Sequence, residues 1–265
     1  MIMAKIYDVN GKEAGNVELP AIFKTEYKPS LVKKVVLAIQ SNKRQAYGRS
    51  PMAGKKTSAH YHGSRHYRYT MMNKEMARIS RIHGRIGNLA FTARFVAQAV
   101  KGRKAHPPVA EKVWSKKINK KESQAAVKSL IAATGNAEMV TARGHRFEKQ
   151  LPVIVTDDFE KITKSKQMAT ALEKVLGVNE MERSGQKKVR AGKGKGRGRR
   201  YRQKVGPLLV VSKSCDAMKA CSGLPGVNTV TAANVSAEAL APGTHAGRLA
   251  VYTVSALKEL EKRFA

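Results

Sequence analysis

The sequence predicts an α/β fold in which helices cover both faces of a mostly parallel sheet of about four strands. Short apolar runs, such as 208–211 and 249–254, alternate with segments whose apolar residues recur at helical spacing. Strands that alternate with helices form parallel sheets whose connections are right-handed. Two strongly basic segments interrupt this pattern. We therefore expect a globular core of residues 1–41 and 107–265, with 42–106 inserted as a long basic loop and 183–204 as a second basic segment within the core.

The N-terminal part of the core is predicted to be a hairpin followed by a helix. Within residues 5–19, the pair Asn10-Gly11 tolerates positive φ and suits a two-residue hairpin turn. Apolar residues then recur at helical spacing over 31–39, with Ser30 as the expected N-cap. This helix leads directly into the first basic segment.

Helices and strands alternate again after that segment. Asn119 and Glu122 have the spacing of a capping box, which predicts a helix that ends before Gly135. Further strands are expected at 151–155, 208–211, 227–235 and 249–254, and further helices at 163–176, near Cys215 and at 255–263.

The charge of the chain is concentrated in the two basic segments. The whole sequence has 51 Lys or Arg against 19 Asp or Glu, a formal charge of +32. Residues 42–106 hold fifteen of these cations and one acid, and residues 183–204 hold eleven cations and no acid. Such an excess repels itself and attracts polyanions, so a nucleic acid is the expected partner.

Other function classes lack their signatures. No stretch of about 18 uncharged apolar residues indicates a membrane span. Residues 48–57 resemble a phosphate-binding loop, but five residues rather than four separate the glycines, and no strand precedes them. We find no nucleophile elbow and no paired catalytic carboxylates, and we interpret Asp157 and Asp158 as helix-capping residues. The chain is therefore not expected to be an enzyme.

Metal and disulfide sites are also not expected. His60, His62 and His66 have a suggestive spacing, but the cations around them repel a metal ion and no carboxylate or Cys is near. The two cysteines, Cys215 and Cys221, are interpreted as buried thiols in one helix. The start of the chain has no secretory signal, so we expect a cytoplasmic protein without cofactors.

Both basic segments have the composition of RNA-binding elements. The first interleaves tyrosines with cations and glycines, so rings can stack on unpaired bases while cations neutralise phosphates. The second alternates Gly with cations over 190–202, which gives long cationic side chains a flexible backbone. Neither can bury enough apolar surface to order itself, so each is expected to fold when it binds RNA. The alternatives are a disordered basic tail without a defined target for the first segment and a solvated linker for the second. Residues 92–100, within the first segment, are expected to be helical.

Eight stretches along the chain resemble the family of large-subunit ribosomal protein four, the L-four family, in its archaeal and eukaryotic form and with the archaeal length. They are LPAIF at 19–23, QAYG at 45–48, KGRKAHPP at 101–108, INKKE at 118–122, VTDDF at 155–159, RAGK at 190–193, GRRYR at 198–202 and LAPGTHAGRL at 240–249. The resemblance covers essentially the whole chain. It implies a three-layer α/β/α core and a long internal loop that reaches into ribosomal RNA and lines the nascent-peptide exit tunnel near its constriction.

The composition of the two basic segments and the resemblance together indicate the residues expected to bind. Expected ribosomal RNA contacts are Arg44, Tyr47, Arg49, Lys55, Lys56, Arg65, Arg68, Arg78, Arg81, Arg85, Arg103, Lys104, His106, Arg190, Lys193, Lys195, Arg197, Arg199, Arg200, Tyr201 and Arg202. The expected tunnel-facing tip is His60, Tyr61, His62, Gly63, Ser64, Arg65, His66 and Tyr67.

The implied function is that of a structural constituent of the large ribosomal subunit, which binds its RNA and supports its assembly. The expected partners are large-subunit ribosomal RNA, neighbouring large-subunit ribosomal proteins and, transiently, the nascent polypeptide, with no membrane and no homo-oligomer. A non-ribosomal regulator that binds messenger RNA or DNA through the same basic segments is the alternative.

Overall fold

Two compact units make up the chain. The structure is a computed structural model that describes residues 3–83 and 87–264. The larger unit combines the residues up to Lys43 with those from Ser115 onward, and the smaller unit is the segment Arg44–Trp114.

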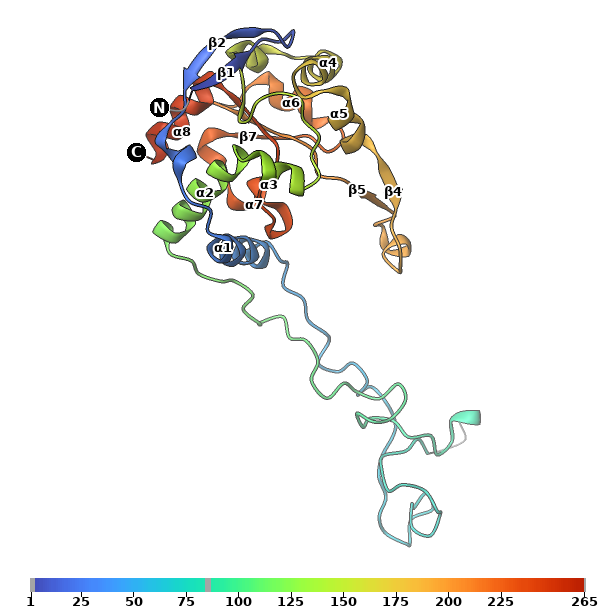
Figure 1. Ribbon diagram of the computed structural model, residues 1–265. Helices are drawn as coiled ribbons and strands as arrows, with labels where there is room; N and C mark the ends of the chain where they lie inside the picture. Colours follow the sequence, from blue (N-terminus) through green and yellow to red (C-terminus); the bar gives the residue numbers. More distant parts are fainter. Residues whose placement is uncertain (1–2, 84–86, 265) are drawn as a thin grey trace. The chain divides into compact units, whose positions relative to one another are not determined.

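A six-stranded sheet organises the larger unit (Figure 1). Its strands are β1 (Met3–Tyr7), β2 (Glu13–Glu18), β3 (Val153–Val155), β6 (Leu208–Val211), β7 (Asn228–Thr231) and β8 (Ala250–Thr253). They lie in the order β2-β1-β3-β8-β6-β7, and every neighbouring pair is parallel except β1 and β2. The predicted α/β class and mostly parallel sheet are confirmed.

The predicted number of about four strands is wrong. The N-terminal hairpin belongs to the same sheet, because Ile6 and Tyr7 of β1 pair in parallel with Ile154 and Val155 of β3. That pairing joins residues almost 150 positions apart, so local sequence patterns did not reveal it.

Helices cover both faces of the sheet. They are α1 (Pro29–Asn42), α2 (Lys120–Thr134), α3 (Ala137–Ala142), α4 (Ser165–Leu176), α5 (Val178–Gly185), α6 (Asp216–Ser222), α7 (Ala237–Leu240) and α8 (Val254–Phe264). The side chains of Ile154, Leu208 and Tyr252 pack on one face with residues of α1, α2, α7 and α8. Those of Val153 and Leu209 pack on the other face with residues of α4 and α6. Successive residues of a strand point to opposite faces, which explains why these strands are apolar throughout.

Most predicted elements are present, with shifted ends. Asp157 and Asp158 were expected to cap the helix that follows them, but both lie within the 3-10 helix Asp157–Lys161, whose N-cap is Thr156. Asp157 Oδ1 instead accepts hydrogen bonds from the Ser255 amide at 2.9 Å and the Ser255 hydroxyl at 2.8 Å, near the start of α8. A residue that follows β3 thus accepts a hydrogen bond from a free backbone amide in the first turn of the C-terminal helix.

Three local details differ from the predictions. The hairpin loop spans Asp8–Lys12, five residues rather than two, because Tyr7 still pairs with Glu13. Pro29 occupies the first turn of α1, which makes Lys28 rather than Ser30 the N-cap. Asn119 is the N-cap of α2, but its side chain makes no capping hydrogen bond.

Two further expectations are wrong. Residues 92–100 form turns instead of a helix; Phe95 has φ +71°, and the Arg94 amide bonds to the Ser80 carbonyl instead of a helical partner. Cys215 is the half-buried N-cap of α6 and not a residue of the helix interior, whereas Cys221 is buried in α6 as expected.

The smaller unit consists of two extended limbs, one that begins at Arg44 and one that ends at Trp114, and a folded tip between them. The limbs pair in antiparallel fashion: the Arg49 amide donates to the Pro108 carbonyl at 3.0 Å, and the backbone of Gly54 passes close to that of Arg103. In the tip, single β-bridges link Arg81 to His60 and to Ala93. The only helix among the described residues of this unit is the 3-10 turn Gly87–Leu89.

Candidate nucleic-acid interface

The second basic segment forms a two-stranded hairpin. Strands β4 (Lys187–Val189) and β5 (Tyr201–Gln203) are antiparallel, and Lys188 lies directly opposite Arg202. Gly192 and Gly198 both have φ +77° in the connecting turn, a conformation that side chains disfavour. The glycines between the cations therefore have a local structural role.

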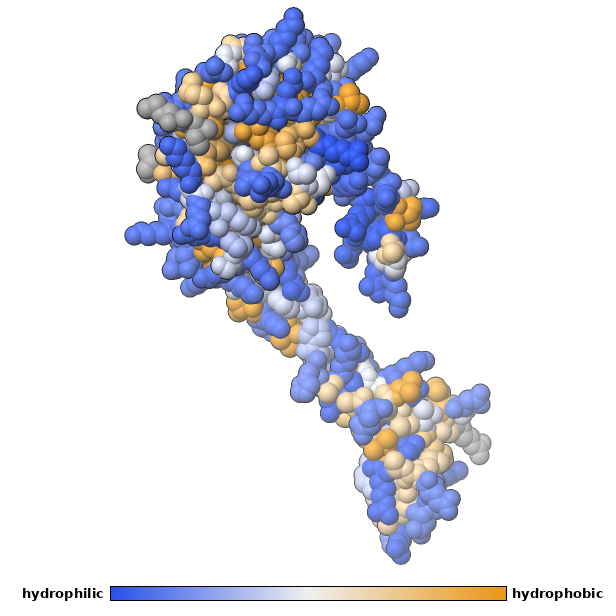
Figure 2. Space-filling model, in the orientation of Figure 1, coloured by the Kyte–Doolittle hydropathy of each residue, from blue (hydrophilic) through white to orange (hydrophobic). Residues whose placement is uncertain are grey.

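The cations of this hairpin are exposed. All eight residues that were expected to bind RNA between Arg190 and Arg202 are exposed, and Figure 2 shows mostly hydrophilic residues over this hairpin. No Asp or Glu occurs between Arg183 and Lys204. Side chains of one sign on an exposed ribbon form a suitable surface for phosphate groups.

Arg183 is the exception among the cations counted in this segment. It lies in α5, is 8% exposed, and donates to the Glu180 carboxylate from Nε at 2.7 Å and from Nη2 at 2.6 Å. The counts of charge along the sequence assigned it to the basic segment, but its charge is already neutralised within the core.

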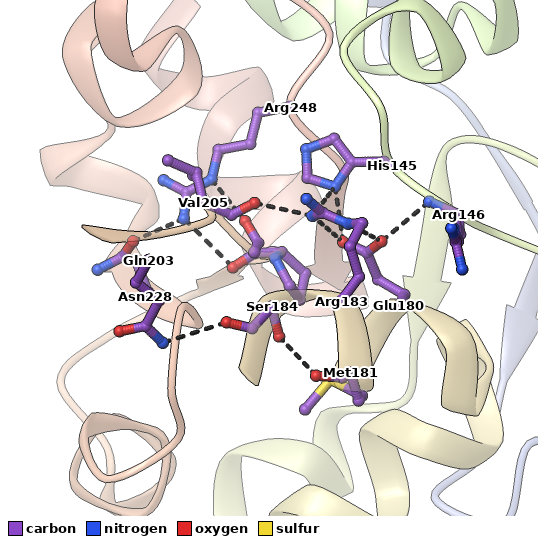
Figure 3. Close-up of polar contacts among 12 residues, drawn as sticks. His145, Arg146, Glu180, Met181, Arg183, Ser184, Gln203, Val205, Asn228 and Arg248 are labelled. Carbon is purple, nitrogen blue, oxygen red and sulfur yellow. Dashed lines mark hydrogen bonds and ion pairs between the residues drawn. The ribbon is translucent and has the colours of Figure 1, made fainter. Parts of the chain in front are cut away.

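Glu180 is the centre of a buried polar network (Figure 3). His145 Nδ1 lies 2.7 Å from Glu180 Oε1, and the Arg146 amide donates to Oε2 at 2.9 Å. Burial alone would raise the pKa of Glu180, but hydrogen bonds from Arg183, His145 and the Arg146 amide outweigh it and lower that pKa to about 2. Burial lowers the pKa of His145, against the opposing effect of Glu180. The carboxylate is therefore ionised, and Arg183 is its cationic partner.

This network anchors the base of the hairpin. Arg183 Nη2 also donates to the Val205 carbonyl at 2.8 Å, and Gln203 Nε2 donates to the Ser184 carbonyl at 3.1 Å. Arg248, which is buried, donates to the Gly206 carbonyl at 3.0 Å (Figure 3). The chain that leaves β5 is thus fixed by three side chains before it enters β6.

An aromatic and cationic cluster connects the start of the first limb to the end of the second. The Arg44 guanidinium lies 3.7 Å from the centre of the Trp114 ring, and Lys112 Nζ lies 4.5 Å from it. The Tyr47 ring stacks on Trp114 at 5.9 Å. Neither Trp114 nor Lys112 was predicted from the sequence, although a single tryptophan beside lysines is a signal for such a cluster.

The tip contains a cluster of rings that the sequence only partly indicated. His83 Nε2 lies 3.2 Å from both His60 Nδ1 and His62 Nε2, and Tyr69 stacks on the His83 ring at 5.2 Å. Tyr67 stacks on His62 at the same distance. His83, and not His66, is therefore the third histidine of the cluster. Burial, together with His62 and His60, lowers the pKa of His83.

The remaining expected contact residues of the first segment differ in accessibility. Exposed cations, tyrosine and histidine are Arg44, Tyr47, Lys55, Lys56, Arg65, Arg68, Arg78, Lys104 and His106, and half-buried ones are Arg49, Arg81 and Arg103. Arg81 donates to the carbonyls of Phe91 at 2.9 Å and Ala77 at 3.0 Å, so its guanidinium supports the tip itself. Arg85 lies outside the described residues. Of the expected tunnel-facing residues, His62 is half-buried and the others are exposed.

The described residues offer neither a metal site nor a membrane-spanning helix. Within residues 3–83 and 87–264, no group of three or more His, Cys, Asp or Glu could hold a metal ion. Every helix in the described part of the chain is too short or too polar to cross a membrane.

Comparisons with known proteins give one consistent family. A model of the "Ribosomal protein L4/L1 family" matches residues 17–263. A relative named large ribosomal subunit protein uL4 from Haloquadratum walsbyi is 45% identical over 262 residues, which cover 97% of this chain and 98% of the relative. Proteins of the same name from Nanoarchaeum equitans and Methanocaldococcus jannaschii are 43% and 42% identical and cover 97% and 98% of this chain, and 97% and 99% of their own lengths.

Proposed function

Because the chain belongs to the ribosomal protein L4/L1 family, we propose that its two basic segments bind large-subunit ribosomal RNA and hold it against the α/β core. Family membership makes the chain a structural constituent of the large subunit of the cytoplasmic ribosome, and not an enzyme. The proposal concerns the surfaces through which it performs this structural role.

The observation that carries the proposal is the exposure of hairpin cations that form no ion pair with any carboxylate in the described part of the chain. Lys193, Arg197 and Arg199 of the hairpin are exposed and form no ion pair with a described carboxylate. Phosphate groups would neutralise these cations and release counterions, which favours binding. The one buried cation of this segment, Arg183, is matched by Glu180 and anchors the hairpin instead.

The rings of the smaller unit add a second mode of RNA binding. Tyr47, Tyr61 and Tyr67 are 52%, 46% and 61% exposed, so a face of each ring is available to a base. Unpaired RNA bases stack on such rings, and nearby arginines can contact the adjoining phosphates. The tip would therefore bind single-stranded or looped RNA.

The proposed position of the tip is the wall of the nascent-peptide exit tunnel. This part of the proposal is supported by the resemblance of the chain to its family and by the exposure of Tyr61, His66 and Tyr67. A surface of histidine, tyrosine and small residues presents few large apolar groups, so a passing peptide would not adhere strongly to it. The nascent polypeptide would be a transient partner.

A deletion tests whether the core folds without the loop and whether the loop supplies most of the affinity for RNA. The Asn42 side chain accepts from the Lys116 amide at 2.7 Å, so the two ends of the smaller unit are close and a short Gly-Ser linker can replace residues 45–113. We expect the shortened chain to retain its helical circular dichroism and to lose most of its affinity for ribosomal RNA fragments. A shortened chain that binds these fragments as tightly as the full chain would refute the proposal. Retention on large subunits after a high-salt wash distinguishes a ribosomal constituent from a transient regulator.

A further inference from the structure

A cavity of about 860 Å³ lies in the larger unit beside the base of the β4–β5 hairpin. Five cationic side chains line it and no Asp or Glu does; they are Arg143, Arg183, Lys188, Arg202 and Lys204. Arg183 is neutralised by Glu180, but the other four form no ion pair with any carboxylate that the structure describes. The cavity is therefore strongly attractive to an anion.

Two of these cations oppose each other directly. Lys188 and Arg202 are cross-strand partners in the β4–β5 ribbon, so their side chains leave the same face of the hairpin, and both line the cavity. Like charges at directly opposite positions destabilise a pair of strands. A phosphate held between them would remove this repulsion, whereas a solvated linker has no need of the arrangement.

Another part of the lining is the loop that precedes β8, through Thr244, His245 and Ala246. Thr244 has φ +73°, a conformation that β-branched residues rarely adopt. Arg143 holds the residues on both sides of it, with one hydrogen bond to the Pro242 carbonyl at 2.9 Å and another to the His245 carbonyl. Strained backbone that the surroundings fix in this way is concentrated at binding sites. Arg143 thus supports this part of the lining through hydrogen bonds within the protein.

The lining also has an apolar part that a phosphate alone would not need. Tyr27, Met139, Ala142, Val205 and Ala246 line the cavity together with the cations. Sites for small organic groups have this mixture, and their volumes are about 300–1,000 Å³. A flat nucleobase would contact the apolar side chains while its phosphate contacts the cations.

We propose that this cavity binds one unpaired nucleotide of RNA, with its phosphate between Lys188 and Arg202 and its base against the apolar lining. The inference rests on the proposed RNA-binding function and adds a defined target to it. The hairpin would then recognise a bulged or looped nucleotide, in addition to attracting phosphates generally.

Binding of two short RNA hairpins to the full-length protein tests this inference. One RNA contains a single bulged uridine and the other is fully paired but otherwise identical. We expect the bulged RNA to bind about tenfold more tightly, the contribution of one stacked base. The double variant Lys188→Ala/Arg202→Ala should lose this preference. The matched variant Lys193→Ala/Arg197→Ala removes two cations from the hairpin turn, outside the cavity lining. It should lower the affinity for both RNAs by the same factor and keep the preference for the bulged RNA.

A photocrosslink supplies a second readout. With 4-thiouridine at the bulge, we expect crosslinks to Tyr27, Met139 or His245. Equal affinity of the full-length protein for the two RNAs, or crosslinks confined to the hairpin turn, would overturn the inference and leave the proposed RNA-binding function standing. A cavity that instead holds an acidic peptide would give this same absence of preference. Failure to bind either RNA would overturn the proposed function and this inference with it.

Discussion

The Arg183 guanidinium and the Glu180 carboxylate form a two-point hydrogen-bonded ion pair, with distances of 2.7 and 2.6 Å, that is shielded from solvent. The same guanidinium donates to the Val205 carbonyl, so the pair links α5 to the chain that leaves the β4–β5 hairpin. Because Glu180 neutralises it, Arg183 is buried in the core although it is the first cation of a basic segment. Its position explains why the exposed hairpin has a fixed base.

Glu180→Gln is expected to destabilise the larger unit by about 3 kcal/mol or more, because it leaves the buried Arg183 without its counter-charge. Urea unfolding followed by circular dichroism measures the loss. Glu182→Gln, at an exposed position of the same helix, is the control and should change the free energy of unfolding by about 0.5 kcal/mol at most. Equal unfolding midpoints for the two variants would contradict this interpretation of the pair.

Acid should weaken the fold through the same carboxylate. The pKa of Glu180 is lowered from 4.5 to about 2 in the folded chain, so the unfolded chain takes up its proton first as the pH falls. The stabilisation is fully present above the unfolded pKa and is lost progressively as the pH falls from about 4.5 towards about 2. We expect the difference in free energy of unfolding between wild type and Glu180→Gln to shrink over this window. A difference that is constant with pH would show that Glu180 is not the titrating group.

Arg44→Ala is expected to make Trp114 more accessible, because the guanidinium covers the indole ring at 3.7 Å. Trp114 is the only tryptophan, so quenching of intrinsic fluorescence by acrylamide reports on this cluster alone. Quenching should increase in Arg44→Ala and remain unchanged in Arg78→Ala, which removes an exposed cation outside the cluster. If both variants quench like the wild type, the cluster does not shield the ring in solution.

The salt dependence of RNA binding should identify the hairpin cations that contact phosphates. Arg197→Ala/Arg199→Ala is expected to reduce the slope of log affinity against log salt by about one for each phosphate that the variant no longer neutralises. The control is Lys164→Ala/Lys166→Ala, which removes two exposed cations outside both basic segments and should leave the slope unchanged. Filter binding at several salt concentrations measures both slopes. Identical slopes for the two double variants would exclude the hairpin from the interface.

The elements of the core were largely predictable because their signals are local. The apolar runs of β3, β6 and β8 and the helical spacing of α1, α2, α4 and α8 reflect burial on the two faces of one sheet. Two of the errors occurred where a distant residue competes with the local signal. The Glu122 carboxylate, expected to complete a capping box, instead accepts from Lys34 Nζ at 2.9 Å, and the predicted helix at 92–100 gives way to backbone pairing with Ser80 and Ile82.

The candidate site was predictable as charge but not as geometry. Counting cations indicated two basic segments and a polyanionic partner, yet it could not separate Arg183, which is neutralised in the core, from Arg190, which is exposed. Nor could it show that Trp114 stacks with Tyr47 across 67 positions of sequence, or that His83 joins His60 and His62.

By itself, the sequence determined the α/β class, the order of its main elements and the location of the basic segments. These features follow from the spacing of apolar residues and the positions of charged residues, which are local properties of the chain. Only the tertiary structure decided that β1 joins the main sheet, that Glu180 anchors the hairpin and that Lys188, Arg202 and Tyr27 line one cavity. These relationships depend on contacts between distant parts of the chain, and such contacts form only when the whole core is packed.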